Sequence, residues 1–268
     1  MPLLLLLHLN DRVSCESGLP LWVDFHAIGK QSLEHTPMIL AGLQKNSFID
    51  FPGKISCVLF TTGCNFICPY CHNADLARGE YPARFELTEI IDFLKSRRGM
   101  LEGVAITGGE PTLDRGIFDL CRAVKSLGYP VKLDTNGSRP GVLRELLARH
   151  LVDFVAMDIK APLNDYHPFS RNPTIHERLT VSIRTLMESA PAYEFRTTCT
   201  APFVNETTVE AIAKTIEGAA CYVLQPFNRR AVCLDPEFNR RQDPNLLPEM
   251  MQRLKALAEP FVERCIIR

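Results

Sequence analysis

The chain has 268 residues, of which 46% are hydrophobic and 23% are charged, and its formal net charge is −1. This length suits one large α/β domain or two small ones, and the composition is that of a globular protein with an ample core. The near-neutral charge is unlike that of a strongly basic nucleic-acid-binding domain. We therefore expect no nucleic-acid partner.

Residues 1–37 show no clear strand or helix period. Six leucines lie between Pro2 and Asn10, but no Lys or Arg precedes them. The run is also shorter than the roughly 20 apolar residues that span a bilayer. We predict a poorly ordered N-terminal extension over 1–37 and no association with a membrane.

The chain has ten cysteines, a density below that of small secreted disulfide scaffolds. Cys57, Cys121, Cys199 and Cys221 lie in apolar runs, where free cysteine behaves as a small buried hydrophobe. This usage favours a reducing compartment, so we expect a cytoplasmic protein.

From residue 55 on, strand-like and helix-like segments alternate. Residues 55–61 (ISCVLFT) read as a buried strand, and 87–98 read as a helix with Thr88 as its N-cap. A strand at 103–107, a helix at 114–127 and a strand at 131–135 follow. Next come a helix at 140–150, a strand at 152–160, a helix at 175–189 and a strand at 193–198. The pattern ends with a helix at 206–217, a strand at 221–225 and a helix at 246–258.

Strict β/α alternation with apolar strands predicts a parallel sheet buried on both faces. Six such units are too few for an eight-unit barrel, so an open doubly wound sheet and a partial barrel both fit. In either fold, polar residues at the carboxyl ends of the strands meet in one place. All six predicted strands end in such stretches, namely TTGCNFICPYCHN, TGGEPT, DTNGS, MDIKAP, RTTCT and QPFNRR.

The first of these stretches carries Cys64, Cys68 and Cys71 in a Cys-x3-Cys-x2-Cys spacing. A structural zinc site would need a fourth protein ligand, for which His72 is the neighbouring choice. His72 directly follows Cys71, and adjacent side chains of an extended segment point in opposite directions, so the two are poorly placed to bind one metal ion. A [4Fe–4S] cluster held by three thiolates leaves one iron open for a cofactor or substrate. The absent fourth cysteine therefore favours the cluster.

In its CNFICPYC form, with Tyr70 before the third cysteine, this loop resembles that of the radical S-adenosylmethionine (radical SAM) enzymes. The resemblance implies that the open iron chelates the amino and carboxylate groups of S-adenosylmethionine. Reduction then cleaves the cofactor to a 5′-deoxyadenosyl radical. The resemblance also implies that Tyr70 packs beside the adenine and that the backbone near His72 forms hydrogen bonds with the adenine edge.

Further motifs agree with this resemblance. Gly108, Gly109 and Glu110 match the Gly-Gly-Glu-Pro turn that holds the methionine ammonium in the family. Asp134 and Asn136 of LDTNG, and Lys160 of MDIK, would line the cofactor and substrate mouth. Arg196 on the fifth strand could bind the cofactor carboxylate through its forked guanidinium. Each also has a plain structural interpretation: a glycine turn, an Asn-Gly turn or a surface ion pair.

The flanks FPGK and HN, with ITGGEPTL, VKLDTNGS and VDFVAMDIKAP, resemble the activating proteins of anaerobic ribonucleoside-triphosphate reductases from Leu40 to Phe227. This resemblance implies a hydrogen abstraction from a glycine of a partner glycyl-radical protein, with a flavodoxin-like electron donor. An activase of another glycyl-radical enzyme, such as pyruvate formate-lyase, is the nearest alternative. A small-molecule radical enzyme such as a deazapurine synthase, or a zinc-binding interaction module, is more distant.

Together, these patterns predict a partial (β/α)6 TIM-like barrel of parallel strands over residues 38–240, followed by a helical tail over 241–268. The three cysteines are the expected cluster ligands. The expected cofactors are a [4Fe–4S] cluster and S-adenosylmethionine.

Overall fold

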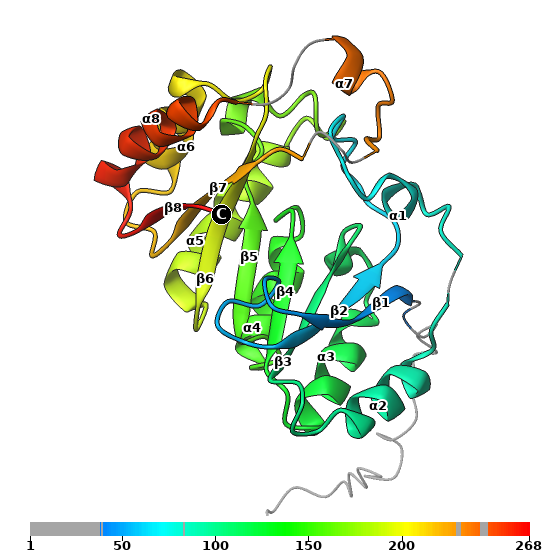
Figure 1. Ribbon diagram of the computed structural model, residues 1–268. Helices are drawn as coiled ribbons and strands as arrows, with labels where there is room; N and C mark the ends of the chain where they lie inside the picture. The colour runs from blue at the N-terminus through cyan, green and yellow to red at the C-terminus, as the bar shows by residue number, and fades with distance from the viewer. Residues whose placement is uncertain (1–37, 39, 83, 229–231, 242–245) are drawn as a thin grey trace, which may run out of the picture. The chain divides into compact units, whose positions relative to one another are not determined.

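The strands of the protein form one curved sheet in which each strand pairs with the next along the chain (Figure 1). The structure is a computed structural model that describes residues 38, 40–82, 84–228, 232–241 and 246–268, so the expectation for residues 1–37 lies outside the described residues. Within these ranges the sheet has eight strands. They are β1 (Leu40–Ser47), β2 (Ser56–Thr61), β3 (Gly103–Gly108), β4 (Val131–Thr135), β5 (Phe154–Asp158), β6 (Tyr193–Cys199), β7 (Tyr222–Pro226) and β8 (Cys265–Ile267).

Strands β2 to β8 are all parallel, and β1 pairs with β2 in the antiparallel sense. Their order in the sheet is their order in the sequence. A doubly wound sheet would reverse its strand order at a switch point, whereas a barrel winds in one direction. The protein is therefore a partial TIM-like barrel of parallel strands, as predicted.

The helices that connect the strands bury one face each. In α3, for example, Ile117, Leu120, Cys121 and Val124 recur at helical spacing and are all buried. Neighbouring helices pack in pairs: α2 with α3, α4 with α5, and α6 with α8. The helices are α1 (Ala74–Arg78), α2 (Leu87–Ser96), α3 (Ile117–Ser126), α4 (Pro140–Ala148), α5 (Ile175–Ser189), α6 (Glu206–Thr215), α7 (Phe238–Arg241) and α8 (Pro248–Ala258).

Two strands were missing from the sequence-based prediction. β1 extends the sheet at one edge, and β8 extends it at the other by pairing Cys265 with Tyr222. The helical tail predicted over 241–268 contains α8, and after α8 the chain returns to the sheet as β8. Thr88 is also not the N-cap of α2. Glu86 holds that position, and its backbone N–H donates to the Glu89 carboxylate at 2.8 Å.

The core is continuous through the described sheet and its helices. The predicted buried cysteines Cys57, Cys121, Cys199 and Cys221 are at most 3% exposed. Among the described residues, no helix combines the length and the apolar character needed to cross a bilayer. The parallel arrangement brings the carboxyl ends of β2 to β6 to one end of the sheet, where the predicted motifs follow the strands.

Candidate functional site

A cavity of about 220 Å³ lies at the carboxyl ends of the parallel strands. The segments that follow β2, β3, β4 and β5, together with β6, line this cavity. Residues far apart in the sequence therefore meet there, as the strand-end pattern predicts. Its lining includes the predicted residues Cys64, Cys68, Tyr70, Cys71, His72, Gly108, Gly109, Asp134, Asn136, Lys160 and Arg196.

The cysteine loop is held in place by main-chain hydrogen bonds at both ends. Near its start, Gly63 N–H donates to Leu76 O at 2.7 Å, and Cys64 N–H donates to Ala77 O at 3.0 Å. Near its end, Cys71 N–H donates to Cys68 O at 3.0 Å. The α1 helix thus fixes the first cysteine, and a tight turn joins the other two.

The thiols of the loop face a largely buried environment. Cys68 is 6% exposed, whereas Cys64 and Cys71 are partly exposed. Burial raises the pKa of the Cys68 thiol to about 12, a shift that the nearby Lys160 ammonium opposes. Burial likewise raises the pKa of Cys64. Burial thus favours the protonated form of the Cys64 and Cys68 thiols, and metal binding would have to displace their protons.

A segment from the C-terminal part of the chain packs against the same loop. Leu234 N–H donates to Cys71 O and Asp235 N–H donates to Pro69 O, both at 3.0 Å. The Arg78 guanidinium at the end of α1 donates to Leu234 O at 2.9 Å. These contacts connect segments that are about 160 residues apart, so no local pattern in the sequence could have shown them.

Tyr70 is buried among aromatic rings rather than exposed in the loop. Its ring centroid lies 5.8 Å from Phe169, 5.8 Å from Phe203, 6.0 Å from Phe238 and 6.5 Å from Phe227. Edge-to-face and tilted contacts at such distances stabilise aromatic clusters. Tyr70 is one of the lining residues of the cavity, and its buried hydroxyl has no hydrogen-bond partner among the described residues. A buried hydroxyl of this kind is suited to a polar group of a ligand.

The Gly108-Gly109 pair packs directly against the start of the cysteine loop. A Cβ atom on Gly109 would lie 2.1 Å from Gly63 O, and one on Gly108 would lie 2.3 Å from Thr61 O. Gly108 also has a φ of +118°, which favours glycine. The two glycines therefore let β3 and its turn lie against the backbone that carries Cys64.

Glu110 is placed differently from the other predicted residues. It is 1% exposed and is not part of the cavity lining. Its carboxylate accepts hydrogen bonds from Thr135 Oγ1 at 2.8 Å and Asn136 N–H at 2.6 Å, and from Thr112. Glu110 thus ties the β3 turn to Thr135 and Asn136, which themselves line the cavity. A contact of Glu110 with a cofactor ammonium stays a prediction.

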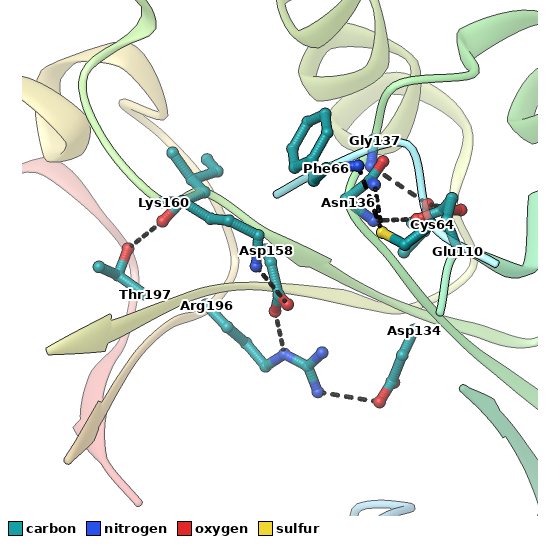
Figure 2. A network of polar contacts seen from close by, with 12 residues as sticks. Cys64, Phe66, Glu110, Asp134, Asn136, Gly137, Asp158, Lys160, Arg196 and Thr197 are labelled. Carbon is teal, nitrogen blue, oxygen red and sulfur yellow. Dashed lines mark hydrogen bonds and ion pairs between the residues drawn. The ribbon is translucent and has the colours of Figure 1, made fainter. Parts of the chain in front are cut away.

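Asn136 connects the β4 turn to the cysteine loop (Figure 2). Its side-chain amide donates to Asn65 Oδ1 at 3.0 Å and lies 3.8 Å from Cys64 Sγ. Asn65 in turn donates to Ser138 Oγ at 2.9 Å. Hydrogen bonds to ligand sulfurs are among the features that set cluster potentials. Asn65 was not recognised in the sequence, because a single Asn between two cysteines carries no distinctive signal.

Four charged residues of the cavity lining, Asp134, Asp158, Lys160 and Arg196, form an ion-pair network, shown in Figure 2. Arg196 Nε lies 2.8 Å from Asp158, and its Nη1 lies 3.2 Å from Asp134. Lys160 Nζ lies 3.2 Å from the other oxygen of Asp158. Lys132, which the sequence analysis did not single out, contacts Asp134 from the interior of β4. Charge-assisted hydrogen bonds of this kind fix the four side chains of Asp134, Asp158, Lys160 and Arg196, which we call the floor of the cavity.

The network shifts the pKa values of its members in the directions that ion pairing requires. Burial by itself would raise the pKa of the Asp158 carboxyl, but Arg196 and Lys160 outweigh burial and lower it to about 2. Asp158 likewise holds the pKa of Lys160 well above its usual range, against the effect of burial. All four groups facing the cavity are therefore charged at neutral pH.

Replacement of Asp158 by asparagine is expected to destabilise the protein at neutral pH and to change its acid sensitivity. The Asp158 pKa is lower in the folded state, so its stabilisation is present above about pH 4 and is lost as the pH falls toward about 2. The expected loss at pH 7 is about 2 kcal/mol. Urea unfolding between pH 2 and pH 7 measures this loss. The free energy of unfolding of the variant should fall less steeply with decreasing pH than that of the wild type.

Asp119→Asn is the matched control for this measurement, because Asp119 forms an ion pair with Arg122 on the exposed face of α3. Exposed pairs of this kind contribute little to stability. If the free energy of unfolding of Asp158→Asn depends on pH between 2 and 7 as that of the wild type does, the ion pairs of Asp158 contribute nothing to folding.

The lining of the cavity fits the cofactors that the sequence resemblance implies. Three cysteines line it, the Tyr70 hydroxyl is unsatisfied, and the charged residues Asp134, Asp158, Lys160 and Arg196 line it as well. Within the described residues, no three His, Cys, Asp or Glu side chains converge as the ligands of a single metal ion would. The cubane places each thiolate on a different iron, so its ligands need not converge on one point. Cys64, Cys68 and Cys71 are the residues that would hold it.

Comparisons with known proteins agree with this site. Residues 58–217 match the radical SAM superfamily. The chain is 32% identical over 238 residues to MJ1227 of Methanocaldococcus jannaschii, which bears the name of a glycyl-radical enzyme activating enzyme. That match covers 86% of this chain and 95% of the relative. A pyruvate formate-lyase-activating enzyme of Staphylococcus epidermidis is 31% identical over 141 residues, 48% of this chain and 55% of the relative.

Solved structures show the same fold at low sequence identity. Streptococcus suis SuiB bound to S-adenosylmethionine has a TM-score of 0.58 at 13% identity over 77% of this chain, which spans about half (48%) of the SuiB chain. Methylornithine synthase has a TM-score of 0.57 at 18% identity over 79% of this chain and 63% of its own. The cysteine loop, the cavity and the matched residues together place this chain in the radical SAM superfamily, among relatives named as glycyl-radical enzyme activating enzymes.

Proposed function

We propose that this protein activates an anaerobic ribonucleoside-triphosphate reductase by installing a glycyl radical on it. The observation that carries the proposal is the sequence resemblance from Leu40 to Phe227, in which the spacing of every motif is intact. The structure supports it because the motifs of that resemblance line one cavity. A relative of nearly the same length, MJ1227, has a name of the same class.

The bound cofactors would supply reductive cleavage of S-adenosylmethionine and a radical that abstracts hydrogen from a glycine. The role of the chain is to hold and orient these groups and to exclude water. Cys64, Cys68 and Cys71 hold the cluster. Eight residues of the cavity lining hold S-adenosylmethionine: Tyr70, His72, Gly108, Gly109, Asp134, Asn136, Lys160 and Arg196.

Each of these groups has a physical reason for its role. The Tyr70 ring, packed by four phenylalanines, offers a rigid surface for the adenine. The glycine pair leaves backbone close to the ligand. Lys160 and Arg196 present positive charge to a carboxylate. A flavodoxin-like protein would supply the electron, and the reaction would take place in the cytoplasm.

Activation of a pyruvate formate-lyase is the second candidate, because the S. epidermidis activating enzyme of that lyase is 31% identical to this chain. That match covers only 48% of this chain. The longer match to MJ1227 does not name a substrate enzyme. The two candidates differ in the partner protein and not in the chemistry of the cavity.

An electron paramagnetic resonance assay separates the two candidates. The cluster-loaded protein is incubated anaerobically with a chemical reductant, S-adenosylmethionine and either reductase or lyase as the purified glycyl-radical partner. We expect the doublet of a glycyl radical with the reductase and little or none with the lyase. A doublet with the lyase alone would replace the first candidate by the second.

A further inference from the structure

Lys132 is a buried cation that the proposed function does not use. It lies within β4, its side chain is 2% exposed, and its ammonium contacts the Asp134 carboxylate. Lysine is almost never fully buried unless it is paired. It does not line the cavity, whereas Asp134, two residues further along the same strand, does.

Lys132 is the inner end of a chain of five alternating charges that leads to the cavity. Lys132 contacts Asp134, Asp134 lies 3.2 Å from Arg196, Arg196 lies 2.8 Å from Asp158, and Asp158 lies 3.2 Å from Lys160. Three of these groups are cationic and two are anionic, so the chain carries a net charge of 3 − 2 = +1. The adjacent buried Glu194 forms a separate neutral pair with Arg268.

The excess charge depends on Lys132. Without it, the two carboxylates would neutralise Arg196 and Lys160, and the floor of the cavity would be neutral. With it, Asp134 is shared between Lys132 and Arg196, which leaves the cavity-facing cations under-compensated. Charges in a buried, poorly screened environment act over several ångströms, so the effect reaches the cavity.

We propose that Lys132 is a positioning residue for the carboxylate of S-adenosylmethionine, acting through Asp134 and Arg196. It gives the floor of the cavity its positive charge while remaining out of contact with the ligand. The proposal depends on S-adenosylmethionine as the cofactor and is independent of which glycyl-radical protein is activated.

The test compares two ligands that differ only in the carboxylate: S-adenosylmethionine and its decarboxylated form. Equilibrium binding to the cluster-loaded protein, without reductant, gives the affinity ratio of the two ligands. We expect Lys132→Met to lower this ratio on the order of tenfold. Lys214→Met, which removes an exposed lysine paired with Glu210 on α6, should leave it unchanged.

A second variant keeps the charge and guards against a folding defect in the first. Lys132→Arg retains one positive charge at this position, so the net charge of the five groups stays at +1. We expect the affinity ratio of Lys132→Arg to stay close to that of the wild type. A ratio as low as that of Lys132→Met would overturn the proposal.

Two further outcomes would also overturn it. An unchanged ratio in Lys132→Met would show that its charge does not reach the ligand. Equal weakening of both ligands would show a purely structural role. Failure of the wild-type protein to bind S-adenosylmethionine at all would instead overturn the cofactor assignment, and this proposal with it.

Discussion

Replacement of Cys68 by alanine is expected to abolish cluster assembly and cleavage of S-adenosylmethionine together. Cys68 is the most buried of the three cavity cysteines, and it is joined to Cys71 by a main-chain hydrogen bond of 3.0 Å. Two thiolates would then have to hold a cluster that is otherwise bound by three. Iron and sulfide analysis after anaerobic reconstitution, with detection of 5′-deoxyadenosine, measures both losses.

Cys121→Ala is the matched control for Cys68→Ala. Cys121 is also buried, at 0% exposed, but it lies in α3 and outside the cavity lining. We expect it to lose about 1 kcal/mol of stability at most and to keep wild-type iron content. Wild-type iron content and cleavage in Cys68→Ala would show that the ligand assignment is wrong.

The second large effect is expected for Gly109→Ala. Its Cβ atom would lie 2.1 Å from the carbonyl oxygen of Gly63, a backbone atom directly before Cys64. Relief of this clash must move either the β3 turn or the start of the cysteine loop. We expect a loss of about 3 kcal/mol in the free energy of unfolding and a parallel loss of cluster loading. Urea unfolding and iron analysis of the same preparation test this.

Gly141→Ala provides the comparison on the same measurements. Gly141 lies in α4, and nothing lies within 4 Å of the position where its Cβ would be. Alanine in a helix is favoured over glycine, so this variant should gain about 0.5–1 kcal/mol. If Gly109→Ala loads iron as well as Gly141→Ala does, the glycine pair is not required for the packing of the cysteine loop.

The parallel strands were predictable because their sequences are strongly apolar. Segments such as SCVLFT and GVAIT are buried on both faces, so each appears as a largely hydrophobic run. The edge strands lacked this signal. β1 has a half-exposed sequence, LAGLQKNS, and β8 has only three residues, CII. Both are strands because a neighbouring strand is available, which is a tertiary property.

The same distinction applies to the cavity. That the three cysteines and the glycine pair line one cavity was predictable, because all of them follow the carboxyl ends of parallel strands. Lys132 was missed, because a lysine within VKLDT looks like the solvent-facing residue of an alternating strand. In a partial barrel both faces of that strand are buried. The contacts between Leu234 and Cys71 also depend on packing between distant segments.

The surroundings of Glu110 could not be predicted from its motif. The Gly-Gly-Glu-Pro turn follows β3, as the sequence predicts, and the Glu110 carboxylate accepts hydrogen bonds from Thr135 and Asn136 at the end of β4. A motif fixes the position of a residue in the chain, whereas the partners of its side chain depend on the hydrogen-bond donors that packing brings near it.

The central claim is that the three cysteines and the charged residues of the cavity form a site that cleaves S-adenosylmethionine. Its most direct test is anaerobic incubation of the reconstituted protein with S-adenosylmethionine and reductant, followed by quantitation of methionine and 5′-deoxyadenosine. We predict equal amounts of the two products, formed only when the cluster is present. A protein that takes up stoichiometric zinc in place of iron and sulfide, and forms neither product, would contradict the claim.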